Sequence, residues 1–175
     1  MLRLSIAGTA ALTLSACVTA PAPQDPSPAA ANAEVRDVSG RLVARSVATT
    51  AGAGVRIRVE AAGLRPGTYG AHVHSIGRCD PPAFESAGPH WNPTSRAHGR
   101  DNPQGQHLGD LPNLVVGTEG SGSFEFTIPS AEVAGGQLPM LDADGAAIVI
   151  HAQADDYRTD PSGNSGGRIA CGIFR

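Results

Sequence analysis

Glycine and proline interrupt this chain so often that they leave little room for long helices. The 175 residues include 22 glycines and 14 prolines, and both residue types punctuate regular structure. Between them lie short stretches in which apolar and polar residues alternate. In one of them, Val55, Ile57 and Val59 alternate with charged residues, which is typical of a strand with one buried face. Eight strands are predicted, over residues 34–38, 41–48, 55–60, 68–75, 114–116, 124–128, 146–151 and 168–174. The pattern predicts an all-β fold, an eight-stranded antiparallel Greek-key barrel or sandwich.

Two stretches between these strands lack strand character. Residues 76–111 and 152–167 are rich in glycine and polar residues, and no apolar alternation runs through either. Loops of this length in a compact domain usually carry function. We therefore expect the chemistry in these two long functional loops.

The charge and hydropathy of the chain exclude two classes of interaction. All 13 basic residues are arginines and the formal net charge is -3, which argues against nucleic-acid partners because phosphate binding selects a basic excess. No apolar run reaches the roughly 18 residues that a membrane-spanning helix needs.

The N-terminus has the features of a secretory signal. Arg3 precedes an apolar stretch over residues 4–14, and the segment ends in Leu14-Ser15-Ala16-Cys17. This end resembles a bacterial lipobox, in which the cysteine is diacylated and becomes the new N-terminus. We expect a signal peptide over residues 1–16 and a lipidated Cys17 that anchors the protein, because two acyl chains give stable membrane binding. The alternative is an ordinary signal peptide in which Cys17 is incidental.

A low-complexity segment follows the expected lipidation site. Residues 17–33 are predicted to form a disordered tether because they offer almost nothing to bury, so the globular domain is expected over residues 34–175. This organisation predicts location in the periplasm or cell envelope, where an oxidising environment favours a disulfide between Cys79 and Cys171. Closing a loop of about 90 residues would stabilise the fold by roughly 4 to 5 kcal/mol in the chain-entropy model.

Histidines are concentrated in the long loops and at adjacent strand ends. His72 and His74 lie one residue apart in a predicted strand, so both imidazoles share a face, although an isolated pair of this kind is more often an ordinary part of a strand. The other ligand candidates are His90, His98, His107, Asp110 and His151. Six histidines with one carboxylate favour borderline transition metals, above all copper and zinc.

Six stretches together resemble the copper/zinc superoxide dismutases of the exported bacterial type. They occur in the order found in that family, and the resemblance covers residues 34–175. They are Gly70-Ala71-His72-Val73-His74, Gly88-Pro89-His90-Trp91-Asn92-Pro93, Ser95-Arg96-Ala97-His98-Gly99, His107-Leu108-Gly109-Asp110-Leu111, Ile150-His151-Ala152-Gln153-Ala154-Asp155 and Gly167-Arg168-Ile169-Ala170-Cys171-Gly172.

The resemblance implies two metal ions per subunit. Copper would be held by His72, His74, His90 and His151. Zinc would be held by His90, His98, His107 and Asp110, with the His90 imidazolate bridging the two ions. Asp155 would join a copper ligand to a zinc ligand and so fix the orientation of both rings. Cys79 and Cys171 match the disulfide of the family.

The resemblance also implies the reaction, the dismutation of superoxide to oxygen and hydrogen peroxide by copper that cycles between two oxidation states. His90 would carry a proton to the nascent peroxide, and zinc would stay redox-silent. Arg168 would hold the superoxide anion by charge and hydrogen bonds. The alternative for Arg168 is a surface arginine in a glycine-rich turn.

The chain departs from the family in two respects. Lysines and glutamates near the copper often steer the substrate in the family, but this chain has no lysine. The steering charge would have to come from Arg168, with Arg96, Arg100 and Arg158 as further candidates. Residues 78–85 differ in a stretch where dimer contacts vary, so a homodimer and a monomer both remain open.

Two other classes of function share some of these features. A non-catalytic periplasmic lipoprotein that binds copper or zinc would keep the ligands. Relatives that have lost catalysis usually lose a copper ligand or the arginine, whereas this chain has both. A zinc hydrolase is disfavoured because no general base lies beside the ligands in the sequence.

Overall fold

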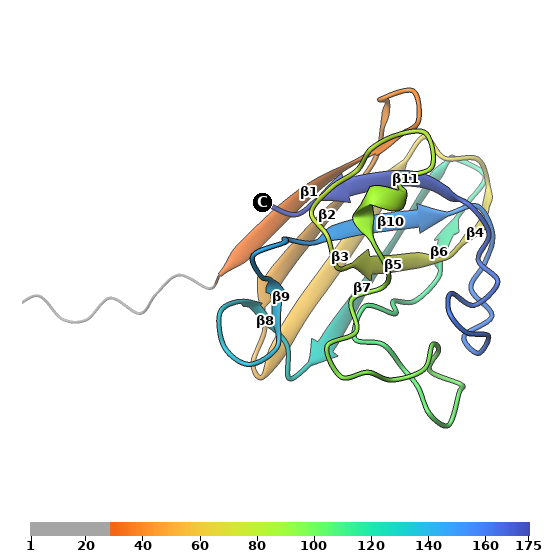
Figure 1. Cartoon of the computed structure of the whole chain (residues 1–175). Helices are drawn as coiled ribbons and strands as arrows, with labels where there is room; N and C mark the ends of the chain where they lie inside the picture. Colours follow the sequence, from red (N-terminus) through yellow and green to blue (C-terminus); the bar gives the residue numbers. More distant parts are fainter. Residues whose placement is uncertain (1–28) are drawn as a thin grey trace, which may run out of the picture.

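The computed structural model describes residues 29–175, and its regular secondary structure consists of strands apart from one short 3₁₀ helix (Figure 1). The largest unit is a seven-stranded sheet in the order β5-β10-β11-β1-β2-β3-β7, in which every neighbouring pair is antiparallel. Its strands are β1 (Ala30–Asp37), β2 (Leu42–Thr50), β3 (Gly54–Ala62), β5 (Ala71–His74), β7 (Ser121–Pro129), β10 (Ala147–His151) and β11 (Arg168–Ile173). Within residues 29–175, no helix is long and apolar enough to cross a membrane.

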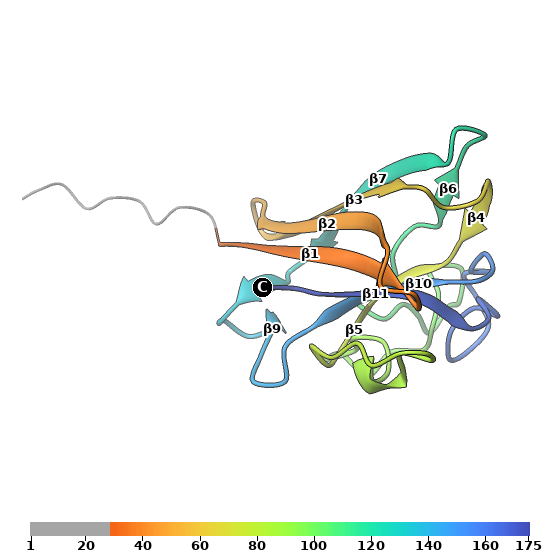
Figure 2. The same ribbon diagram turned by 90° about the horizontal axis from the view of Figure 1, so that it is seen from above.

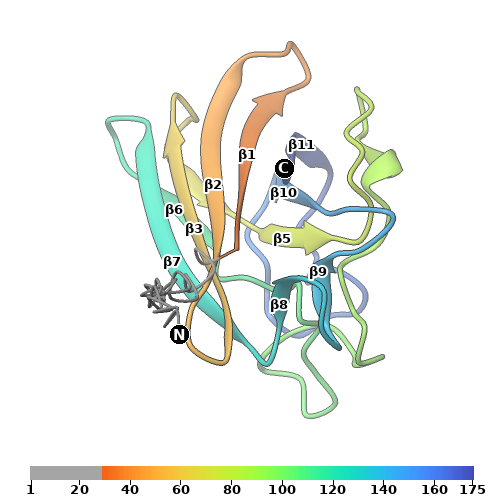
Figure 3. The same ribbon diagram turned by 90° about the vertical axis from the view of Figure 1, so that its left-hand side faces the viewer.

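The sheet curls until its two ends face each other, as Figures 2 and 3 show from two directions. The gap between them is bridged by β4 (Gly67–Tyr69), which pairs with β6 (Leu114–Val116). Strand β6 in turn lies beside β7, where a side chain at Gly122 would collide with the carbonyl group of Val115. Neighbours far apart in sequence, such as β1 and β11, are typical of Greek-key connections.

The predicted strand over residues 68–75 is interrupted once, at Gly70. The Gly70 N–H donates to the carbonyl of Gln153 in the second long loop instead of joining a strand, and a side chain at Gly70 would collide with Ser165. Strands β4 and β5 are therefore two halves of one predicted strand, and counting them together gives the eight-stranded antiparallel barrel that the sequence predicts. The sequence did not predict β8 (Glu132–Ala134) and β9 (Pro139–Leu141), a short parallel pair.

The barrel interior is filled by aliphatic side chains from alternate strand positions. Val55, Ile57 and Val59 are fully buried on β3, whereas Arg56, Arg58 and Glu60, which alternate with them, are exposed. Because every second residue of a strand points to the same face, this alternation fixes which face of β3 forms the core.

The domain begins earlier than the sequence predicts. Strand β1 starts at Ala30 and pairs with β2, and Ala31 and Ala33 are buried in the core. The prediction that the tether extends to residue 33 and the domain starts at residue 34 is therefore wrong for residues 30–33. Ala31 and Ala33 are buried in the core at alternate positions of β1, which composition alone does not reveal. The predicted signal peptide (1–16), Cys17 and the predicted tether up to residue 28 lie outside the described residues.

Candidate metal centre

Two neighbouring strands supply three of the predicted copper ligands. On β5, Val73 points into the barrel core, so His72 and His74 point to the outer face. Strand β10 pairs with β5 with Val149 opposite His72, and His151 is the last residue of β10. The first long loop lies against the same strands and adds His90, whose backbone forms a bridge with His74.

The four predicted copper ligands converge on one point. One ring nitrogen from each of His72, His74, His90 and His151 lies within 4.8 Å of the others. The His72 ring centroid is 3.9 Å from that of His90 and 4.8 Å from that of His151. All four side chains are buried, so water does not compete for these nitrogens as it would at the surface.

Hydrogen bonds fix which nitrogen of each ring is free. His74 Nδ1 donates to the Gly88 carbonyl at 2.8 Å, and His151 Nδ1 donates to the Gly166 carbonyl at 3.1 Å. His72 Nε2 donates to the Asp155 carboxylate at 2.8 Å. The opposite nitrogens, His72 Nδ1, His74 Nε2 and His151 Nε2, are buried without a hydrogen-bond partner, and so is His90 Nε2. Each of these free nitrogens can therefore offer a lone pair, which is what a metal requires of an imidazole.

Asp110 is the centre of the second cluster. Its Oδ1 lies 2.9 Å from His90 Nδ1, 3.0 Å from His98 Nδ1 and 3.1 Å from His107 Nδ1. Its Oδ2 accepts the backbone N–H groups of Gly99 and His107, at 2.9 and 3.0 Å. Three imidazole nitrogens around one carboxylate are a donor set that suits tetrahedral zinc.

A second selection of four ligand atoms within 4.8 Å of one another overlaps this cluster. It contains His72, His90, His98 and Asp110, so His72 replaces the predicted ligand His107. The contacts of His107 favour the set with His107, because its Nδ1 is close to both Asp110 and His90, at 3.1 and 3.3 Å. His72 Nε2 is instead occupied by Asp155.

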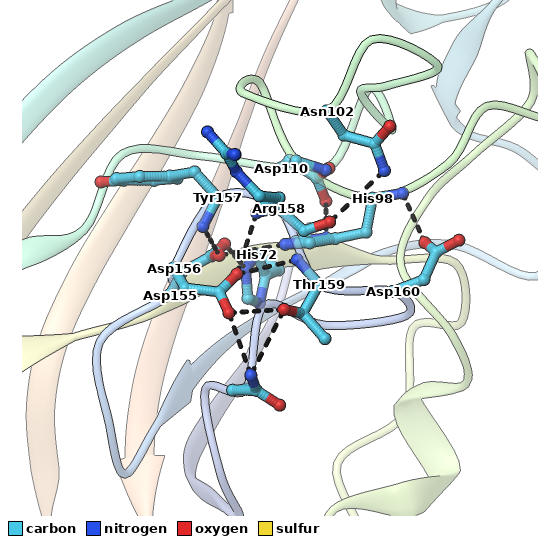
Figure 4. A network of polar contacts seen from close by, with 12 residues as sticks. His72, His98, Asn102, Asp110, Asp155, Asp156, Tyr157, Arg158, Thr159 and Asp160 are labelled. Atoms are coloured by element: carbon cyan, nitrogen blue, oxygen red, sulfur yellow. Dashed lines mark hydrogen bonds and ion pairs between the residues drawn. The ribbon is translucent and has the colours of Figure 1, made fainter.

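Asp155 connects the two clusters through hydrogen bonds to one histidine of each (Figure 4). Its Oδ2 accepts from His72 Nε2 at 2.8 Å and its Oδ1 accepts from His98 Nε2 at 3.0 Å. Both contacts are buried. The carboxylate thus holds one ring of each cluster in a fixed tautomer, as the resemblance implied for this residue.

The pKa values of these groups follow from burial and from the two carboxylates. Burial lowers the pKa of His72 to about 3 and that of His151 to about 4, and it also lowers the pKa values of His74 and His90. Burial opposes protonation of His98 too, but its hydrogen bonds to Asp110 and Asp155 raise the pKa of His98 to about 9. Burial would raise the pKa of both carboxyl groups, yet hydrogen bonds from the histidines hold both well below the usual range. The copper-side imidazoles are therefore neutral at pH 7, as ligands must be.

A cavity of about 810 Å³ opens onto the copper-side cluster. His90, His151 and Arg168 line it, and Glu85 and Asp142 add two carboxylates. Of the four arginines that the sequence suggested for steering, Arg168 is the one that lines this cavity; Arg96, Arg100 and Arg158 do not. No pattern in the sequence pointed to Glu85 or Asp142, because tertiary packing brings both to the cavity.

Arg168 is held by the first long loop. Its guanidinium donates to the carbonyl oxygens of Phe84 and Gly88, both at 2.8 Å. The predicted disulfide between Cys79 and Cys171 is confirmed, with Cα atoms 5.7 Å apart, and it ties this loop to β11. The loop also carries the short 3₁₀ helix η1 (Glu85–Ala87), which lies over β10 and β11 in Figure 1. Cys79 and Cys171 pack in a small apolar cluster with Phe84 of this loop.

Comparison with known proteins agrees with this geometry. The family model described as copper/zinc superoxide dismutase (SODC) matches residues 38–174. The chain is 50% identical over 123 residues to the superoxide dismutase-like protein YojM of Bacillus subtilis (strain 168), covering 69% of this chain and 63% of that protein. It is 41% identical over 148 residues to a Cu-Zn superoxide dismutase of Caulobacter vibrioides, covering 83% of this chain and 85% of the relative.

Solved structures share the fold. A crystal structure of the superoxide dismutase-like protein from Bacillus subtilis superposes with a TM-score of 0.77 at 42% identity, over 81% of this chain and 96% of that one. The Cu/Zn superoxide dismutase from Brucella abortus superposes with a TM-score of 0.67 at 26% identity, over 84% of this chain and 100% of that one. Because the family model spans nearly all of the described barrel, the chain belongs to the copper/zinc superoxide dismutase family.

Proposed function

We propose that this protein is an enzyme that converts two superoxide anions and two protons into oxygen and hydrogen peroxide. The observation that carries the proposal is the set of four buried ring nitrogens without hydrogen-bond partners, one each on His72, His74, His90 and His151. Leaving buried polar atoms unpaired costs free energy, and a shared metal ion would satisfy all four at once.

We assign one metal to each cluster. Copper would be held by His72, His74, His90 and His151, and zinc by His90, His98, His107 and Asp110, with one ion of each per subunit. Copper, when bound, supplies the one-electron oxidation and reduction that superoxide dismutation needs. Because zinc has no redox chemistry of its own, its ligands would serve structure and electrostatics.

The cavity residues would bind and orient the anion. Arg168 lines the cavity with its guanidinium oriented by two carbonyls, so its positive charge is fixed in the cavity that His90 and His151 also line. His90 also lines the cavity and its Nε2 has no partner, so this nitrogen can hold a proton and release it to a bound anion.

A non-catalytic metal-binding protein is the second candidate. It is favoured by the likeness to YojM, which is named superoxide dismutase-like, and by the two carboxylates that share the cavity with Arg168. Both candidates require the metal ligands, so metal content alone does not separate them. The rate of superoxide removal per bound copper does.

We further propose that the protein is exported and anchored in the cell envelope by lipid on Cys17. The support is the Leu14-Ser15-Ala16-Cys17 sequence after an apolar stretch, together with the Cys79–Cys171 disulfide, which is common in oxidising compartments.

The test of the enzymatic proposal is metal analysis paired with a direct superoxide assay. We expect one copper and one zinc per chain, and superoxide decay by pulse radiolysis that is proportional to bound copper. The control is His151→Ala, which removes one copper-side nitrogen and leaves Asp110 and its three histidines in place. Metal-loaded protein with no more activity than His151→Ala would instead favour the non-catalytic candidate.

A further inference from the structure

Asn113 holds the backbone of Asp155 with a reciprocal pair of hydrogen bonds. Its amide Nδ2 donates to the Asp155 carbonyl at 2.9 Å, and the Asp155 N–H donates to Asn113 Oδ1 at 2.8 Å. Asn113 immediately precedes β6, so this pair fastens the second long loop to the barrel wall. The carboxylate that joins the two metal clusters is thus fixed at its own backbone.

Tyr157 completes this clamp with three of its polar atoms. Its N–H donates to Asp155 Oδ1 at 2.6 Å, and its Oη accepts the Asn113 N–H at 2.7 Å. Its carbonyl accepts the Asp101 N–H at 3.0 Å. The Arg100 guanidinium lies 3.8 Å from the centre of its ring, which is the geometry of a cation–π contact. Tyr157 therefore contacts both long loops as well as the segment that leads into β6.

The backbone of Tyr157 is held in an unusual conformation. Its φ of 61° lies in the left-handed region, which costs free energy for a residue with a side chain and persists only where the surroundings impose it. Opposite it, Gly99 has a φ of 93°, and any side chain there would collide with the Tyr157 carbonyl. Gly99 also donates its N–H to Asp110 Oδ2 at 2.9 Å. The close packing of Tyr157 on Gly99 thus connects Asp155 to the second carboxylate, Asp110.

We propose that Tyr157, acting with Asn113, is a positioning residue that sets the orientation of Asp155 and thereby of His98 and His72. It would act without touching either metal. Loss of its hydroxyl removes the acceptor for the Asn113 N–H, which lets the Asn113–Asp155 clamp move and releases the carboxylate that orients one ring of each cluster. This inference rests on the zinc and copper assignments of the proposed function, because it predicts how tightly those ligands hold their ions.

A positioning role differs from a merely structural one in what it changes. Loss of a hydrogen bond anywhere in the barrel lowers stability, but displacement of Asp155 also alters the ligand field and the metal affinity. The chain offers a matched control, because its other tyrosine, Tyr69, donates its hydroxyl to the Arg65 carbonyl at 2.8 Å, on β4 and outside both long loops. Tyr157→Phe and Tyr69→Phe therefore each remove one hydroxyl hydrogen bond.

The experiment measures zinc transfer from the full-length, metal-loaded protein to a chromophoric chelator. Tyr157→Phe is expected to weaken zinc binding about tenfold, because loss of a group that orients a metal ligand typically lowers metal affinity by that factor or more. Tyr69→Phe should leave zinc affinity unchanged. With cobalt(II) in place of zinc, Tyr157→Phe is expected to shift the visible absorption bands, and Tyr69→Phe to leave them in place. Asn113→Ala removes both hydrogen bonds to the Asp155 backbone, so it is also expected to weaken zinc binding.

Three outcomes decide the matter. The expected difference between the two tyrosine variants supports the positioning role. Equal zinc affinity and equal cobalt spectra in wild type and Tyr157→Phe would overturn the inference while leaving the proposed function intact. Wild-type protein that binds neither metal would instead overturn the proposed function, and the inference with it.

Discussion

The Arg168 guanidinium donates a hydrogen bond of 2.8 Å to the carbonyl oxygen of Gly88. The same oxygen accepts a hydrogen bond of 2.8 Å from His74 Nδ1. One carbonyl of the first long loop therefore orients both a predicted copper ligand and the residue that would hold the anion. The disulfide between Cys79 and Cys171 anchors this loop to the strand that begins with Arg168.

Replacing Arg168 tests the anion site without removing a metal ligand. Arg168→Ala is expected to keep both metals and to lower the second-order rate with superoxide about tenfold at low ionic strength, because a fixed positive charge raises the local concentration of an anion. Salt dependence should flatten as well, since screening acts on that charge. Arg168→Lys should recover part of the rate and Arg168→Glu should be slowest. Stopped-flow or pulse-radiolysis rates over a salt series measure this, and an Arg168→Ala rate equal to wild type would refute the anion site.

Removing a negative charge from the cavity should raise the rate with superoxide, whereas removing the charge of Arg168 should lower it. Glu85 and Asp142 line the cavity with Arg168, and both side chains are exposed. Glu85→Gln and Asp142→Asn are each expected to raise the rate at low salt a few-fold, because they remove repulsion of the anion. Glu119→Gln is the matched control, since Glu119 is exposed but does not line the cavity. A similar gain in the control would attribute the effect to net charge alone.

The two clusters can be separated by substitution. His107→Ala and Asp110→Ala are expected to lower zinc affinity at least about tenfold more than copper affinity, and to lower thermal stability, because their contacts lie on the zinc side. His151→Ala should instead abolish turnover while zinc remains bound. Metal analysis after dialysis against a competing chelator measures both losses. Equal loss of both metals in all three variants would contradict the assignment of two sites.

The stability of the metal-free protein should depend on pH in a defined direction. Burial lowers the pKa of His72 to about 3 and that of His151 to about 4, from 6.5. Below pH 6.5 the unfolded chain therefore binds protons that the folded chain excludes, and stability falls as the pH decreases toward 4. Each of these histidines should lower the free energy of unfolding by on the order of 2 kcal/mol as the pH falls from about 7 to 5.

His98 changes the stability in the opposite direction, because it stabilises the folded protein at low pH and not at high pH. Its pKa is raised to about 9 against the burial that opposes protonation, so its stabilisation is full below pH 6.5 and is lost as the pH rises toward 9. Urea unfolding of the metal-free protein should therefore show maximum stability close to neutral pH. Stability that stays constant from about pH 7 to pH 5 would show that these imidazoles are not held neutral.

Cys17→Ser tests the anchor. The variant is expected to leave the membrane fraction while its superoxide activity per copper is unchanged, because the barrel begins at Ala30. Mass spectrometry of the wild-type N-terminus should find a diacylated cysteine. Wild-type protein without lipid mass would contradict the proposed anchor.

The sequence predicted the parts of this protein that depend on rare residue types and on short-range alternation. The chain has six histidines, and all six lie in the two joined clusters, so few other arrangements could use them. The alternation of Val55, Ile57 and Val59 likewise identified a strand and its buried face. The two cysteines of the described domain left a single possible pair, and they form it.

Tertiary structure decided which common residues reach the site. Glu85, Asp142 and Tyr157 have no distinctive spacing in the sequence, and the folding of separate loops against β5 and β10 gives each its neighbours. Packing also placed Ala30 in a strand and left Arg96, Arg100 and Arg158 away from the cavity. The physical reason is that a metal ligand is recognisable by its chemistry, because few side chains offer a nitrogen lone pair. A residue that lines a cavity or orients a ligand is defined by contacts between distant segments, and those exist only after the barrel has closed.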